Sequence, residues 1–160
     1  LLPVTTRLIL IAPKGKAEEA ITRLSRVGFE NIIGYWDESL DEMYGVVIGF
    51  DNIPCVDPGN LEVEMKMNPG IVLDVRNVAE FRDSHIKGSH NLPLNTLMDH
   101  YTALHKNVRY YLVCAGGYRS MMAASLLASK GFTEIVNVNG GMAKVKEVAK
   151  ELVVQPEHVL

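Results

Sequence analysis

The sequence predicts an α/β protein of three layers, in which helices cover both faces of a central parallel sheet. Short, continuous apolar segments, such as 8–12 and 71–75, are typical of parallel strands that are buried on both faces. Each of these strands is followed by a stretch with helical signals, and strands that alternate with helices form a covered parallel sheet. An internal repeat of this pattern extends the same fold class to the N-terminal part of the chain.

Residues 8–35 and 111–138 repeat one strand–helix–strand pattern at a constant offset and without a gap. Leu24 of the first helix corresponds to Leu127 of the second, and both helices stop at a Gly-Phe pair. Glycine is the preferred residue just past a helix end, so the shared pair marks the same position in both copies. We interpret the pattern as a duplication.

The first copy lacks the strand and helix that precede the second copy, which predicts that the first copy is incomplete. The sequence also starts at Leu1 with neither a methionine nor a signal pattern, and we expect it to be part of a longer chain. Four parts are expected: a partial repeat at 1–50, a linker at 51–56, a complete domain at 57–152 and a C-terminal tail at 153–160.

Local signals predict the elements that precede and follow the second copy. Asp57 and Pro58 are typical of a helix start, and this helix is expected to end near Met65. Asn77, with Glu80 three residues later, predicts a short helix that begins with a capping box. The remaining elements are expected as a strand at 71–75, an amphipathic helix at 95–104 capped by Asn95, and a last helix at 142–152.

Composition and charge are those of an ordinary globular protein. The formal net charge of −3 predicts neither nucleic acid nor an anionic membrane surface as a partner. No apolar run approaches the roughly 18 residues that cross a bilayer. The two cysteines, Cys55 and Cys114, make a poor disulfide framework, which favours a reducing, cytoplasmic location. The histidines have no zinc-type spacing, so we expect no metal and no cofactor.

Cys114 ends a buried strand, and a glycine-rich loop with a helix start follows it directly. Backbone N–H groups of such a loop and helix start converge on one point and favour negative charge there. Arg119 adds a positive charge at a helix N-terminus, where the helix dipole disfavours a cation, and a nearby anion would explain its presence. Both features stabilise a thiolate, which is the reactive form of cysteine. The sequence therefore predicts Cys114 as a nucleophile.

Two other interpretations apply to these residues. A lone cysteine at a strand end is most often a small buried side chain, and an arginine at a helix end is most often solvated.

The first copy has Ile11 in place of Cys114 and Lys16 in place of Arg119, so we expect it to be structural. Cys55 follows a proline in the expected linker, where nothing would lower the pKa of its thiol.

Several segments together resemble the rhodanese (thiosulfate sulfurtransferase-like) homology domain over about 57–152. The Cys-x-x-Gly-x-Arg-Ser loop is the most specific of them. The segments that carry the resemblance are Leu73-Asp74-Val75-Arg76, Glu80-Phe81, His85-Ile86-Lys87-Gly88-Ser89, Asn91-Leu92-Pro93, Cys114 to Ser120, and Gly140-Gly141-Met142.

The resemblance implies a sulfurtransferase that moves sulfane sulfur from thiosulfate or a persulfide to a thiophilic acceptor. Cys114 would carry the sulfur as a persulfide, Arg119 would serve an anionic substrate, and Asp74 and Arg76 would support the site. The substrate-binding residues that the resemblance implies are Ala115, Gly116, Gly117, Tyr118 and Ser120.

The first 50 residues resemble the C-terminal half of a second, cysteine-less copy of the same domain. That order is similar to proteins in which both copies follow a metallo-β-lactamase-fold domain, so an upstream domain of this kind is expected. One departure is that Asp37-Glu38-Ser39 stand where the second copy has Gly140-Gly141-Met142.

Two rival functions remain open. Cysteine-dependent phosphatases also place a thiolate and an arginine around a loop of amides, but with one residue more between them than separates Cys114 from Arg119. The sequence also offers no well-placed aspartate as a general acid. A non-catalytic interaction or regulatory module is the second rival, because a fold alone does not determine a function.

Overall fold

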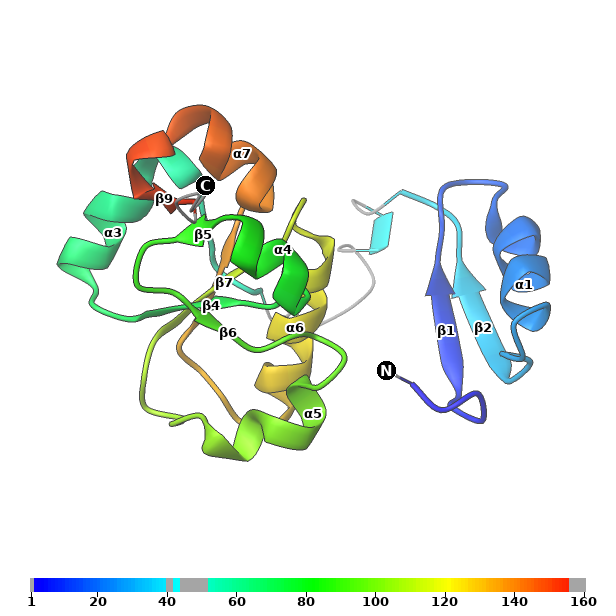
Figure 1. Ribbon diagram of the computed structural model, residues 1–160. Coiled ribbons are helices and arrows are strands. Elements are labelled where there is room, and N and C mark those ends of the chain that lie inside the picture. Colours follow the sequence, from blue (N-terminus) through cyan, green and yellow to red (C-terminus); the bar gives the residue numbers. More distant parts are fainter. Residues whose placement is uncertain (1, 40–41, 44–51, 156–160) are drawn as a thin grey trace. The chain divides into compact units, whose positions relative to one another are not determined.

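The computed structural model describes residues 2–39, 42–43 and 52–155, and the chain forms two compact units, Leu1–Asp51 and Asn52–Leu160. The first unit is a strand–helix–strand motif whose two strands are parallel. Its elements are β1 (Leu8–Ile11), α1 (Ala17–Ser25) and β2 (Ile32–Trp36), shown at the blue end of the colour scale in Figure 1.

The second unit is built on a five-stranded sheet in the order β3-β8-β7-β4-β6, in which every neighbouring pair is parallel. All residues of the neighbouring strands β7 and β8 are buried, as their continuous apolar sequences predict. The strands are β3 (Cys55–Val56), β4 (Ile71–Asp74), β6 (His90–Asn91), β7 (Tyr110–Val113) and β8 (Ile135–Val138). The predicted α/β class with a central parallel sheet is confirmed.

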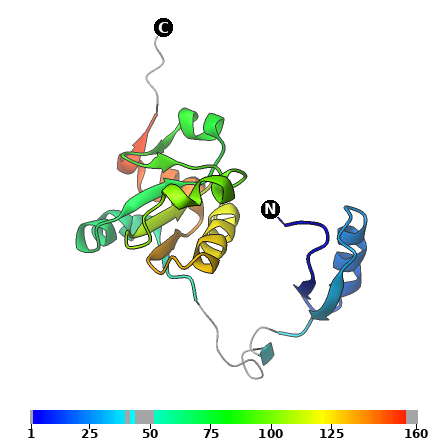
Figure 2. The ribbon, with the colours of Figure 1, turned by 90° about the horizontal axis from the view of Figure 1, so that it is seen from below.

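Helices pack on both faces of this sheet, which gives three layers (Figures 1 and 2). Successive strand residues point to opposite faces, so Leu112 lies in the cluster under α5 and α6, and Val113 lies in the cluster under α3 and α7. The helices are α3 (Leu61–Met67), α4 (Val78–Asp83), α5 (Leu97–His100), α6 (Tyr118–Ser129) and α7 (Gly141–Val148). Within the described ranges, no helix has the length and apolarity needed to cross a membrane.

Very short elements account for most differences from the expected boundaries. Cys55 and Val56, expected in a linker, form edge strand β3 against β8. The expected tail contributes β9 (Val153–Val154), which pairs antiparallel with β5 (His85–Ile86). A pair of residues is too short for a periodic pattern, so neither strand has a signal of its own in the sequence.

Two helix starts test the capping signals. The capping box at α4 is confirmed, since the Asn77 side chain accepts a hydrogen bond from the Glu80 amide at 2.9 Å. The expected cap at Asn95 is wrong. The helix α5 begins after Thr96, which has helical backbone angles and caps no amide with its side chain. The helix that the sequence predicts from Asp57 and Pro58 to about Met65 is also divided, into a 3₁₀ turn at Pro58–Asn60 and α3.

Candidate active site

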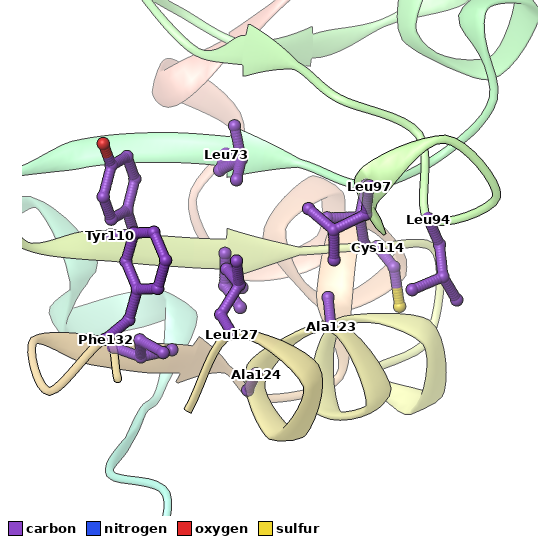
Figure 3. Packing of buried hydrophobic residues seen from close by; sticks show 12 residues of the cluster. Leu73, Leu94, Leu97, Tyr110, Cys114, Ala123, Ala124, Leu127 and Phe132 are labelled. Carbon is purple, nitrogen blue, oxygen red and sulfur yellow. The ribbon is translucent and has the colours of Figure 1, made fainter. Parts of the chain in front are cut away.

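The loop from Cys114 to Gly117 connects the end of the central strand β7 to the start of α6. Cys114 is only 1% exposed, and its sulfur lies among Leu94, Leu97 and Ala123 in the cluster between the sheet and α5 and α6 (Figure 3). Carboxyl ends of parallel strands are where open α/β sheets bind their ligands. The fold therefore places the thiol at the expected end of the sheet.

Two groups contact the sulfur with hydrogen-bond geometry. The Gly117 amide donates to Sγ at 3.1 Å, and the Ser120 hydroxyl oxygen lies 3.4 Å from Sγ. The same hydroxyl lies 2.9 Å from the Gly117 carbonyl oxygen, and because it has one hydrogen it donates to one of the two at a time. Gly117 has a φ of 102°, in the left-handed region that favours glycine.

The environment of Cys114 lowers the pKa of its thiol below the ordinary value. Burial by itself would raise that pKa, because it disfavours the charged thiolate. Hydrogen bonds from the Ser120 hydroxyl, and from the amides of Ser120, Gly117 and Gly116, favour the thiolate more strongly and reverse the sign. A lowered pKa favours the thiolate, the reactive form of cysteine, and the role of Cys114 as a nucleophile stays a prediction.

The start of α7 holds the loop from behind. The amides of Met142 and Ala143 donate to the carbonyl oxygens of Cys114 and Ala115, at 2.7 and 2.9 Å. Gly141 has a φ of 58°, and a Cβ atom there would collide with the Cys114 carbonyl oxygen. The resemblance included Gly140-Gly141-Met142, but the sequence alone does not reveal that this segment supports the loop.

Asp74 and Arg76 form a buried ion pair at the end of β4, next to the loop. Their side chains are at most 4% exposed, and the Arg76 guanidinium reaches the Asp74 carboxylate at 2.6 Å and the Ser84 carbonyl oxygen at 2.6 Å. The side-chain amide of Asn91 donates to the backbone carbonyl oxygens of both Asp74 and Arg76, at 2.9 Å each. These contacts fix the chain between β4 and α4, and a supporting role for the pair stays a prediction.

Arg119 is held by Glu80. Its two terminal nitrogens each lie 2.8 Å from a different oxygen of the Glu80 carboxylate. The hydrogen bond raises the pKa of the Arg119 guanidinium and lowers that of the Glu80 carboxyl. Glu80 is also fixed at α4, where its carboxylate accepts from the Asn77 amide at 3.2 Å. In the structure, a carboxylate of the protein binds Arg119, and a role of Arg119 toward an anionic substrate stays a prediction.

A cavity of about 280 Å³ lies beside the loop. Its lining combines two acidic side chains, two basic ones and the backbone that follows Cys114. The lining residues are Arg76, Glu80, Asp83, Ala115, Met142, Ala143 and Lys146.

The other predicted site residues lie in different surroundings. Tyr118 begins α6 and is 87% exposed. Cys55 is exposed on edge strand β3, two strands away from β7, and strands lie about 4.8 Å apart. That separation exceeds the roughly 7 Å limit between Cα atoms for a disulfide with Cys114. Within the described residues, no group of His, Cys, Asp and Glu could hold a metal ion.

The structure thus holds a thiol with a lowered pKa against a backbone amide, at the end of a parallel strand of an α/β fold. The rhodanese-like domain family matches residues 58–148, which is more than half of the chain. The protein belongs to this family.

Relatives support the same assignment. The thiosulfate sulfurtransferase GlpE of Ectopseudomonas mendocina is 33% identical over 49% of this chain and 72% of its own length. YqhL of Bacillus subtilis is 38% identical, and the match covers 46% of this chain and 58% of YqhL, less than two thirds of its length. A rhodanese-like domain protein from Staphylococcus aureus has a similar structure, with a TM-score of 0.54, 31% identity, and coverage of 58% of this chain and 91% of that one.

Proposed function

We propose that the protein is a sulfurtransferase in which Cys114 takes up sulfane sulfur as a persulfide and passes it to a thiophilic acceptor. The observation that carries the proposal is the contact of Sγ with the Gly117 amide and the Ser120 hydroxyl, at 3.1 and 3.4 Å. These donors stabilise a thiolate. The family match and the relatives that are named thiosulfate sulfurtransferases support the same activity.

The reaction has two displacements. The Cys114 thiolate attacks the outer sulfur of the donor, an S–S bond forms, and the donor's S–S bond breaks so that sulfite or a thiolate leaves with the electron pair. A nucleophilic acceptor then attacks the outer sulfur of the persulfide, and the Cys114 thiolate leaves. The charge therefore stays near the loop throughout, where fixed amides stabilise it.

Intact mass tests this proposal directly. After incubation with thiosulfate or with a persulfide, the protein should gain the mass of one sulfur atom, and cyanide should remove that mass as thiocyanate. No gain of mass with either donor would show that the domain does not transfer sulfur.

We also infer that 1–50 is a cysteine-less, partial copy of the second unit. Support comes from strand register, since Ile9 pairs with Gly34 and Leu112 pairs with Asn137, and both residues of the second pair lie 103 positions after those of the first. The repeat at 8–35 and 111–138 has that same offset. An upstream metallo-β-lactamase-fold domain and a cytoplasmic location stay predictions from the sequence.

A further inference from the structure

The charges around the loop of Cys114 are balanced pair by pair. Arg119 binds Glu80 at 2.8 Å, and Lys146 lies 3.8 Å from the Asp83 carboxylate. Arg76 binds the buried Asp74 and contributes no net charge. Each of these cations thus has an acidic partner, so the three pairs supply no net positive charge to offset that of the Cys114 thiolate and an incoming anionic donor.

We propose that Glu80 is a specificity-determining residue, which restrains Arg119 and directs the site away from dianionic donors. The preferred donors are then sulfane-sulfur compounds with at most one negative charge near the reacting sulfur, such as persulfides and organic thiosulfonates. The inference rests on the proposed sulfurtransferase function. It acts through Arg119, and Glu80 is a positioning residue that does not touch the reacting atoms.

The geometry of the pair supports this role. A guanidinium that binds both oxygens of a carboxylate uses the two donors with which it would otherwise bind a sulfonate group. Glu80 cannot easily move away, because the capping box ties its amide and its carboxylate to Asn77. A dianion such as thiosulfate must therefore share Arg119 with a fixed negative charge.

Two donors that react in the same way but differ in charge isolate the effect of donor charge on sulfur transfer. Thiosulfate (charge −2) gives its outer sulfur to the Cys114 thiolate and releases sulfite with the electron pair of the broken S–S bond. Methanethiosulfonate (charge −1) gives its outer sulfur in the same way and releases methanesulfinate. The quantity of interest is the ratio of kcat/KM for thiosulfate to kcat/KM for methanethiosulfonate, with cyanide as the acceptor.

Glu80→Gln removes the carboxylate charge and keeps a similar shape. The side chains of Glu80 and Arg119 are 30% and 36% exposed, so the effective dielectric constant lies between that of water and that of the interior. Thiosulfate carries one negative charge more than methanethiosulfonate. The attraction of that charge to the released Arg119 guanidinium, a few ångströms away, should raise the ratio of the kcat/KM values by about tenfold in favour of thiosulfate. The double variant Glu80→Gln/Arg119→Gln should lose this gain.

Glu134→Gln is the matched control. It also removes a carboxylate that binds an arginine, since Arg109 lies 2.7 Å from Glu134 and 3.4 Å from Glu64, but at the start of β7 and β8, away from the loop. The ratio should stay within about twofold of the wild-type value, because the charge change lies beyond a screened distance from Cys114. A tenfold change in this control would overturn the inference, because it would show that any lost carboxylate has the same effect.

The wild-type protein gives a second test that does not depend on the folding of a variant. Because the three ion pairs supply no net positive charge to attract thiosulfate, kcat/KM for thiosulfate should not fall by more than about twofold between 0.02 and 0.3 M salt. A steep fall would overturn the inference. If neither donor adds sulfur to Cys114, the proposed function itself fails, whereas sulfur transfer with a ratio that Glu80→Gln leaves unchanged refutes only the role of Glu80.

Discussion

The two units contain the same junction, from a parallel strand through a short loop to a helix, with different results. In the first unit the loop follows β1, and Ile11 at the end of that strand is 59% exposed. In the second unit the loop follows β7, and Cys114 at the corresponding position is 1% exposed. The same backbone order can thus present either an apolar residue of the surface or a buried thiol.

Hydrogen bonding also differs between the two loops. The Lys16 amide, at the start of α1, donates to the Pro13 carbonyl oxygen at 2.9 Å, and a backbone turn satisfies it. The Gly117 amide, at the start of α6, donates to Sγ of Cys114 at 3.1 Å. An amide nest therefore needs more than a loop before a helix. Its amides must converge on one reactive side chain, whereas in the first loop the Gly15 amide donates to the Asp37 carboxylate at 3.4 Å and the Lys16 amide to a carbonyl oxygen of the loop itself.

The largest effect is expected for the thiol. Cys114→Ser should abolish sulfur uptake and thiocyanate formation, because a hydroxyl is not ionised at neutral pH and cannot form a persulfide. Cys55→Ser should keep wild-type activity, since Cys55 lies exposed on the edge strand. Thiocyanate assays and intact mass of both variants check this. Activity that survives in Cys114→Ser would remove the distinction between the two junctions.

The next effect concerns the glycine behind the loop. Gly141→Ala should lower activity by more than about tenfold and the free energy of unfolding by about 1–3 kcal/mol, because it adds a collision to a left-handed backbone. Gly15→Ala in the first unit is the control. It has a φ of 73° but open space around it, so only the backbone strain of about 1 kcal/mol applies.

Urea unfolding and thiocyanate assays of these two variants sharpen the comparison. Gly15→Ala should keep its activity. Equal activity losses in both variants would show that left-handed glycines matter for general stability and that Gly141 has no particular role at the loop.

The sequence predicts this site well where the signal is local. Continuous apolar strands, the loop after Cys114 and the capping box of Asn77 and Glu80 each lie within a few residues, and the structure contains the strands and the capping box. The contact of Glu80 with Arg119 joins residues 39 positions apart, and the spacing of neither residue indicates it. The support of the loop by Gly141 is also remote in sequence, since Gly141 lies 27 positions after Cys114. Long-range contacts of single side chains follow from the packed fold, which no local pattern specifies.

A smaller effect is expected at Ser120. Its hydroxyl lowers the pKa of the Cys114 thiol, so Ser120→Ala should raise that pKa and reduce the thiolate fraction at neutral pH. The rate of sulfur uptake should fall several-fold at neutral pH and recover as the pH is raised. Ser129→Ala, at the other end of α6, should leave the pH profile unchanged. A uniform loss at every pH would indicate that Ser120 acts on packing and not on ionisation.

The smallest effect compares two ion pairs, Glu80 with Arg119 and Glu38 with Lys14. The folded state lowers the pKa of Glu80, so its pairing stabilises the protein above the ordinary carboxyl pKa and is lost as the pH falls through the folded-state value. The pair is partly exposed, which limits its contribution to about 1 kcal/mol. Glu80→Gln should therefore lower the free energy of unfolding by about this amount at pH 7. In strong acid the wild-type protein and the variant should unfold alike.

Glu38→Gln should have no measurable effect at either pH, because water surrounds both partners of that pair. Urea titrations at the two pH values check both statements, and a loss in Glu80→Gln that is equally large in acid would contradict an ionic origin.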